Sequence, residues 1–123
     1  MRILFLIGAG GFLGSIARYL TQQGIGKILP VVFPFGTFIV NIAGCFLIGV
    51  LYAFSDRSNL MSQEWRLFLT TGFCGGFTTF STFSMESYSL IREEQYLYFA
   101  LYAGLSVVLG ILATFSGIAI FSR

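Results

Sequence analysis

One stretch, Gly72 to Glu86, combines residue types that are unusual together in a membrane-spanning segment. It reads Gly-Phe-Cys-Gly-Gly-Phe-Thr-Thr-Phe-Ser-Thr-Phe-Ser-Met-Glu: three glycines, then five hydroxyl side chains interleaved with phenylalanines, then a carboxylate. A helix interior disfavours this density of glycine. Irregular polar backbone is tolerated at membrane depth only where protein covers it or water reaches it. The stretch therefore predicts the lining of a small permeation pathway.

The side chains of this lining would contact an ion through groups that carry only a partial positive charge. Phe77, Phe80 and Phe83 recur every third residue and so share one face of a helix. Such stripes usually pack, but the intervening hydroxyls, which include Ser81 and Thr82, argue for a pathway. Ring edges are the positive end of the aromatic quadrupole, which suits a partly dehydrated small anion that must also leave. Tyr102 and Ser106, at i and i+4, could extend the polar track on another helix.

Three other polar residues lie in apolar surroundings, and each leaves two interpretations open. Asn41 is either an interhelical hydrogen-bonding partner or an NH₂ donor to a passing anion. Arg18 either reaches to the headgroups or forms an electropositive vestibule. Glu86 is the acid within a predicted span, and it either caps a network near the surface or acts in the pathway. Its protonation state stays open.

The glycines suggest a second structural feature, an interrupted helix. Gly72, Gly75 and Gly76, followed by Thr78-Thr79, could interrupt a helix near the bilayer centre. An interruption frees backbone carbonyls, which are suitable ligands for a hard cation such as Na⁺. If two antiparallel copies met at their interruptions, carbonyls from both would surround one ion on the two-fold axis. The sequence does not say which threonine faces the pathway.

Composition predicts the elements that must hold these residues. The chain has 123 residues, 56% hydrophobic and 10% charged, with mean hydropathy +0.86, whereas soluble domains carry about 25% charged residues. It is therefore predicted to be an integral membrane protein. It has no histidine and no nucleotide-binding or catalytic motif, so no enzymatic function is expected. Cys45 and Cys74 lie in apolar runs and are expected to be buried thiols.

We expect a single all-α membrane domain over residues 1–123. A span needs about 20 apolar residues, and the predicted spans cover about 3–22, 35–54, 67–91 and 96–121, the third broken near its middle. The first is expected to be retained rather than cleaved as a signal peptide. Gln22–Lys27 and Arg92–Gln95 are predicted turns, and Ser55–Asn59 a loop.

Four spans place both termini on one side of the membrane. Arg2, Arg57, Arg66 and Arg123 then belong to the terminal side, and Lys27, Arg92 and Arg18 to the other. Since basic residues in short loops set orientation, this weak bias permits insertion both ways round; the alternative is that Arg2 or Arg66 alone decides. Gly10 with Gly14, and Gly72 with Gly76, have the GxxxG spacing that favours close helix association.

The whole chain resembles the Fluc (CrcB) family of fluoride channels. The resemblance rests on residues 11–19, Gly-Phe-Leu-Gly-Ser-Ile-Ala-Arg-Tyr, on residues 36–44, Gly-Thr-Phe-Ile-Val-Asn-Ile-Ala-Gly, and above all on Gly72 to Glu86. It implies a passive, selective channel in the bacterial inner membrane that exports cytoplasmic fluoride. It also implies a dual-topology antiparallel homodimer with two pores, lined by both subunits.

The resemblance further implies roles for particular residues. Phe80 and Phe83 would be the pore phenylalanines, Asn41 a donor and Arg18 a vestibule residue. Ser81, Thr82, Glu86, Tyr102 and Ser106 would lie along the polar track. Backbone carbonyls of Gly75 and Thr78 would hold a structural Na⁺ at the dimer centre. The alternative is a small dual-topology multidrug or cation exporter, but such exporters use a first-span carboxylate, and this first span carries Arg18 instead.

Overall fold

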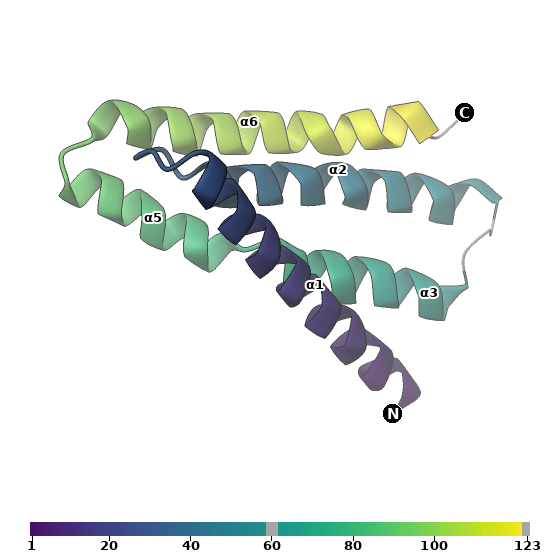
Figure 1. Ribbon diagram of the computed structural model, residues 1–123. Coiled ribbons are helices and arrows are strands. Elements are labelled where there is room, and N and C mark those ends of the chain that lie inside the picture. Colours follow the sequence, from purple (N-terminus) through teal and green to yellow (C-terminus); the bar gives the residue numbers. More distant parts are fainter. Residues whose placement is uncertain (59–61, 122–123) are drawn as a thin grey trace.

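The computed structural model describes residues 1–58 and 62–121, with the side chains of 56–58 left out. Within these ranges the chain is helical almost throughout (Figure 1). Three long helices, α1 (Arg2–Ile28), α2 (Phe35–Ser58) and α6 (Tyr96–Phe121), are accompanied by a segmented stretch. Its segments are α3 (Gln63–Leu67), the π-helical η1 (Phe68–Cys74), α4 (Gly75–Phe77) and α5 (Phe80–Arg92).

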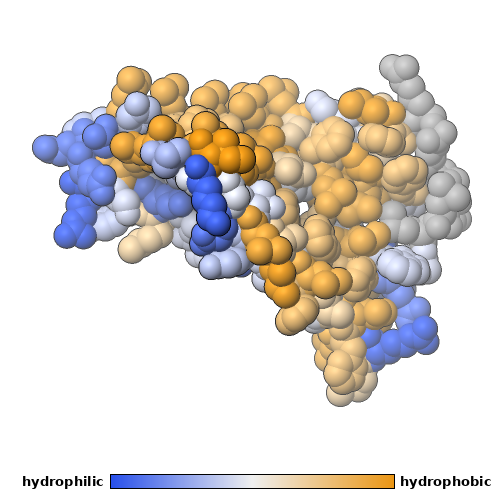
Figure 2. Space-filling model, viewed as in Figure 1, coloured by the Kyte–Doolittle hydropathy of each residue, from blue (hydrophilic) through white to orange (hydrophobic). Residues whose placement is uncertain are grey.

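The three long helices have the length and apolar composition of membrane spans. A helix satisfies its own backbone hydrogen bonds, as hydrocarbon surroundings require. Helix α2 lies along α6, whereas α1 crosses η1 and α4 obliquely (Figure 1). Many large apolar side chains on α1 and α6 are exposed, and hydrophilic residues gather toward the ends of the molecule (Figure 2). This surface is that of a chain surrounded by lipid or by further protein.

The segmented stretch contains the predicted interruption, but the glycines do not make it. Gly72, Gly75 and Gly76 lie within η1 and α4. The helix stops after Phe77, and Thr78 and Thr79 adopt extended backbone with ψ of 157° and 120°. The threonine pair therefore forms the break, and the chain resumes as α5.

The glycines instead permit two helices to approach closely. A Cβ at Gly72 would lie 2.8 Å from the Ile7 carbonyl oxygen, and one at Gly76 would lie 2.6 Å from that of Gly11. On the facing helix, a Cβ added at Gly10 or Gly14 would likewise collide with backbone atoms of η1 and α4. The two GxxxG pairs thus face each other within one chain, which confirms the close association that their spacing predicts.

The turn predicted at Gln22–Lys27 is wrong, because α1 continues through it to Ile28. Helical glycine costs about 1 kcal/mol relative to alanine, so Gly24 and Gly26 weaken this end without ending it. One turn earlier α1 is fixed to α2, because Gln22 Nε2 donates a hydrogen bond of 3.0 Å to Thr37 Oγ1. Arg18 consequently lies well inside α1.

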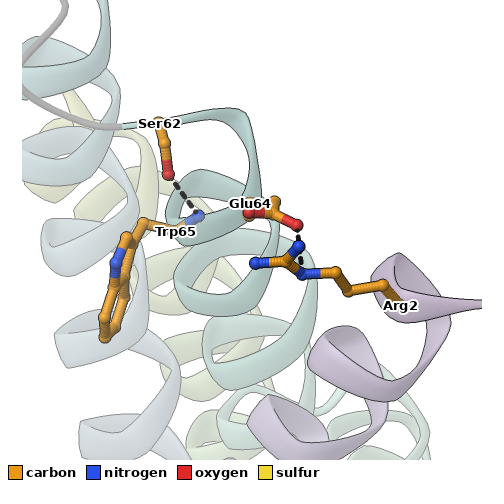
Figure 3. A network of polar contacts seen from close by, with 4 residues as sticks. All are labelled: Arg2, Ser62, Glu64 and Trp65. Carbon is orange, nitrogen blue, oxygen red and sulfur yellow. Dashed lines mark hydrogen bonds and ion pairs between the residues drawn. The ribbon is translucent and has the colours of Figure 1, made fainter.

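The other connections are short. The turn at Arg92–Gln95 is confirmed: Gln95 N donates to Leu90 O at 2.8 Å, and Glu94 has φ of 59°. At the opposite end Ser62 caps α3 by accepting from Trp65 N at 3.2 Å, and Arg2 pairs with Glu64 at 2.8 Å (Figure 3).

Two predictions concern residues near the end of α2. The loop predicted at Ser55–Asn59 begins later, because α2 runs through Ser58, and residue 59 lies outside the described residues. The side chain of Arg57 and all of Arg123, used above in counting charges, also lie outside them.

Candidate functional site

The break at Thr78–Thr79 is held by one side chain from α2. Asn41 Oδ1 accepts a hydrogen bond from Thr79 N at 2.8 Å, and Asn41 Nδ2 donates to Thr79 O at 3.1 Å. The amide therefore replaces the acceptor that the Thr79 N–H gives up on leaving the helix, and it adds a second donor to the Thr79 C=O, which as the N-cap carbonyl already accepts the first bond of α5. Asn41 is thus an interhelical hydrogen-bonding residue, and the second Nδ2 proton remains available for another acceptor.

Thr79 also starts α5. Its Oγ1 accepts from Thr82 N at 3.2 Å, which is the arrangement of a helix N-cap. The same oxygen donates to Thr82 Oγ1 at 3.1 Å and lies 3.4 Å from Ser81 Oγ. The predicted hydroxyl residues Ser81 and Thr82 are consequently gathered at the first turn of α5, with Thr79 as their common partner.

The break leaves backbone carbonyls without their ordinary helical donors. In a continuous helix the amide of Thr79 would donate to Gly75 O and that of Thr82 to Thr78 O, but these amides donate to Asn41 and to Thr79 Oγ1. Gly75 and Thr78, which the family resemblance implies as cation ligands, are the residues so affected. Their carbonyls fit the donor set of a hard monovalent cation.

A third carbonyl at the break has a basic partner. Arg18 Nε donates to Gly76 O at 3.0 Å from α1, and this contact is partly buried. The guanidinium keeps further N–H donors. Arg18 is therefore directed at the break, and its role at a vestibule stays a prediction.

The break opens onto a hollow of about 390 Å³ between α2 and the segmented stretch. Asn41, Gly75, Thr78, Thr79 and Phe80 line it, together with Gly44, Cys45, Ile48, Thr70 and Cys74. The carbonyl residues of the predicted cation site and the Asn41 amide thus border one space. Among the described residues, no group of three or more acidic, cysteine or histidine side chains could hold a metal.

A second polar centre lies between α5 and α6. Tyr102 is fully buried, and its hydroxyl donates to Glu86 Oε1 at 3.0 Å. The Phe83 ring lies 4.9 Å from the Tyr102 ring, and Phe33 and Phe38 contact the other sides at 5.6 and 6.5 Å. The structure therefore brings together three predicted track residues, Phe83, Glu86 and Tyr102, in an aromatic cage.

Phe80 and Ser106 occupy contrasting environments. The Phe80 side chain is 79% exposed, although its ring lies 5.7 Å from that of Phe83. It borders the hollow at the break and a second one of about 570 Å³ shared with Ser81, Ser84, Met85 and Tyr88. Ser106 Oγ is buried without a hydrogen-bonding partner among the described residues. In a single chain the Phe80 ring is therefore left as exposed apolar surface. Ser106 Oγ is left as a buried polar atom without a partner among the described residues.

Two polar residues of this region were missed by the sequence reasoning. Thr37 is 2% exposed, and it precedes Asn41 by four residues, so its place on the same face of α2 could have indicated it. Gln22 reaches Thr37 from α1; no sequence signal marked it, because it was assigned to a turn.

Comparison with known proteins places the chain in a family. Residues 5–118 match a family model described as "CrcB-like protein, Camphor Resistance (CrcB)". A protein of Flavobacterium psychrophilum is 47% identical over 120 residues, covering 98% of this chain and 97% of the relative. One of Leptospira interrogans is 50% identical over 115 residues, covering 94% and 91%. One of Bacteroides fragilis is 52% identical over 120 residues, covering 95% and 94%.

All three relatives carry the name "Fluoride-specific ion channel FluC". The match reaches into every helix described above and covers the break and the aromatic cage. With three apolar helices of spanning length among the residues that the structure describes, the chain is a multi-pass membrane protein, and it belongs to the CrcB family.

Proposed function

We propose that this protein is a passive fluoride channel rather than an enzyme. The observation that carries the proposal is the near-full-length identity, 47–52%, with relatives named fluoride-specific ion channels. The local chemistry agrees with it, because a polar, partly irregular segment lies among apolar helices. Fluoride that enters a cell as the neutral acid ionises and is trapped, and a channel would let the anion leave down its electrochemical gradient.

The proposed path runs along α5. Phe80 and Phe83 would offer ring edges, and Ser81 and Thr82 hydroxyl groups. Asn41, with one amide proton uncommitted, would donate at the break. Farther along, Glu86, Tyr102 and Ser106 would continue the track. Each contact is weak, so an anion could be partly dehydrated and still released.

The functional unit is proposed to be an antiparallel homodimer with two pores. Two features of the single chain support a partner subunit that packs beside the break. These are the exposed Phe80 ring and the open hollow next to it. The near-balanced basic residues permit both insertion orientations. Each pore would then combine α5 and α6 of one subunit with residues of the other.

Na⁺ is proposed to bind at the dimer centre. Gly75 and Thr78 from each subunit would supply the carbonyl ligands, since their ordinary helical donors are engaged elsewhere. The ion would stabilise two breaks that otherwise expose backbone dipoles toward each other. Arg18 would raise the anion concentration at the pore entrance.

The competing function is a small multidrug or cation exporter with the same four-span plan. Such a protein exchanges protons for cations through a first-span carboxylate. Here α1 carries no acidic residue, and its internal charge is Arg18 bonded to Gly76 O. Helix α1 therefore offers no carboxylate through which that exchange could run.

Efflux from proteoliposomes separates these functions. Vesicles loaded with fluoride or chloride are diluted into anion-free buffer with valinomycin and K⁺ to balance charge. We expect rapid fluoride efflux and chloride efflux no faster than in protein-free vesicles. Equal rates for both anions, or fluoride efflux that requires an imposed proton gradient, would refute the passive selective channel.

A further inference from the structure

A hollow of about 270 Å³ lies between the start of α1 and the start of the segmented stretch. An opposite-charge pair spans it: Arg2 Nε on α1 lies 2.8 Å from Glu64 Oε2 on α3 (Figure 3). Both elements contribute to the full lining, which consists of Arg2, Leu6, Ser62, Glu64, Trp65 and Phe68. The hollow therefore combines a cation and a carboxylate with an apolar surface.

The lining changes from charged to apolar along the helices. Leu6 follows Arg2 by four residues, and Phe68 follows Glu64 by four, which is a rise of about 6 Å along a helix. Helix α1 has the length and composition of a membrane span and begins at Arg2. The ion pair therefore lies at the level of the lipid headgroups, and the two apolar residues lie deeper. Trp65, 60% exposed, is typical of that interface.

Both members of the ion pair can bind a further group. The contact engages Arg2 Nε, and a guanidinium has four more N–H donors on its terminal nitrogens, in a planar arrangement that matches phosphate. The contact engages Glu64 Oε2, and a carboxylate accepts about four hydrogen bonds through its two oxygens. The two side chains are 81% and 38% exposed, so a molecule in the surrounding membrane can reach both.

The adjacent charges discriminate between phospholipid headgroups. The phosphate of any phospholipid can accept from Arg2, but an anionic headgroup then brings no cation to Glu64 and is repelled by it. A choline group balances the carboxylate without an N–H to donate. An ethanolamine group carries a primary ammonium, which has three N–H donors. Only this last headgroup offers a phosphate acceptor and an ammonium donor together.

We propose that this hollow binds phosphatidylethanolamine. Its phosphate accepts from the Arg2 guanidinium, its ammonium donates to the Glu64 carboxylate, and its glycerol and upper acyl chains pack on Leu6 and Phe68. The bound headgroup contacts α1 and α3 at once and so links the start of the first span to the start of the segmented stretch.

Carbodiimide coupling tests the contact between ammonium and carboxylate, because it joins a carboxylate to an adjacent primary amine as an amide. The full chain in vesicles of phosphatidylethanolamine and phosphatidylcholine is treated, and peptide mass spectrometry measures the lipid adduct on each acid. Glu93, exposed in the turn between α5 and α6, is the matched control. We expect about 1.5- to 5-fold more adduct on Glu64 than on Glu93, the range for one exposed ion pair. Equal or smaller coupling at Glu64 would overturn the site.

The Arg2→Gln variant distinguishes a bound lipid from simple access to the carboxylate. Removing the guanidinium uncovers Glu64, so random coupling to it would increase. Loss of the phosphate contact instead predicts about 1.5- to 5-fold less adduct on Glu64. An increase, or no change, would contradict the proposal. Arg92→Gln removes an exposed basic residue at the end of α5 and should leave coupling at Glu64 as in the wild type.

Two further arms test other occupants. Soluble phosphoethanolamine, given to protein in pure phosphatidylcholine, should couple with no preference for Glu64 over Glu93, since it has no acyl chains to pack on Leu6 and Phe68. A preference equal to that of the lipid would contradict a lipid site. Replacing phosphatidylcholine by phosphatidylglycerol should leave the lipid adduct on Glu64 unchanged, and its disappearance would show that an anionic lipid occupies the hollow instead. None of these measurements depends on fluoride conduction.

Discussion

Replacing Asn41 by leucine tests how the break in the third helical stretch is maintained. Asn41 satisfies both the N–H and the C=O of Thr79, at 2.8 and 3.1 Å. Leucine has a similar size but no polar atom, so the Thr79 N–H would lose its acceptor and the Thr79 C=O would lose one of its two donors. An unsatisfied buried backbone group costs about 1–3 kcal/mol. Loss of the second donor to the C=O adds about 0.5–1.5 kcal/mol, so Asn41→Leu is expected to cost about 2–4 kcal/mol.

The free energy of unfolding can be measured by titrating SDS into detergent micelles and following the fluorescence of Trp65, the single tryptophan. Protein concentration must be fixed, because an oligomer unfolds in a concentration-dependent way. Ile39→Leu is the matched control, since Ile39 lies on the same helix and is 38% exposed. A loss below about 0.5 kcal/mol in Asn41→Leu, where surface substitutions fall, would refute the claim that this side chain holds the break.

Other changes test the packing of α1 against the segmented stretch, the aromatic cage, the role of the Phe83 ring, and the orientation of the chain in the membrane. Gly76→Ala should destabilise by about 1–3 kcal/mol, because its Cβ would lie 2.6 Å from Gly11 O, whereas Gly104→Ala, with nothing within 4 Å, should not; equal melting temperatures would contradict this. Tyr102→Phe keeps the ring and loses the bond to Glu86, so fluoride efflux should fall about 2- to 12-fold with the fold retained. Phe83→Ile should slow efflux, and an unchanged rate would mean that the ring only packs. Single-cysteine labelling at Ser62, in a chain lacking Cys45 and Cys74, should find both orientations, and labelling from one side alone would refute dual topology.

Much of the helical arrangement was predictable because apolar runs of spanning length have few alternatives. The predicted starts at 35 and 96 agree with α2 and α6. Gln22 shows the limit of such reasoning. Glycines at 24 and 26 are typical of a turn, but α1 continues through both to Ile28, beyond the point where Gln22 contacts Thr37 and Gly36 of α2. The local preference for a turn did not decide where the helix ends.

The site was predictable where residue type alone carried the signal. An amide among apolar residues and a hydroxyl-rich stretch indicated Asn41 and the Thr78–Thr79 region. The sequence could not indicate which of these residues plays which structural role. The glycines pack against α1, the threonines form the break, and Asn41 bridges it. Which backbone amide is captured by which side chain depends on geometry between helices that are distant in sequence.

The most direct test of fluoride conduction is the reversal potential of the current through the protein in a planar bilayer. With a tenfold fluoride gradient and equal pH and chloride on both sides, a passive fluoride channel predicts reversal at about 59 mV, the value for a singly charged ion. Adding a chloride or proton gradient should leave that potential unchanged. A reversal potential that moves with chloride or pH, or the absence of any fluoride current, would contradict a passive, selective fluoride channel.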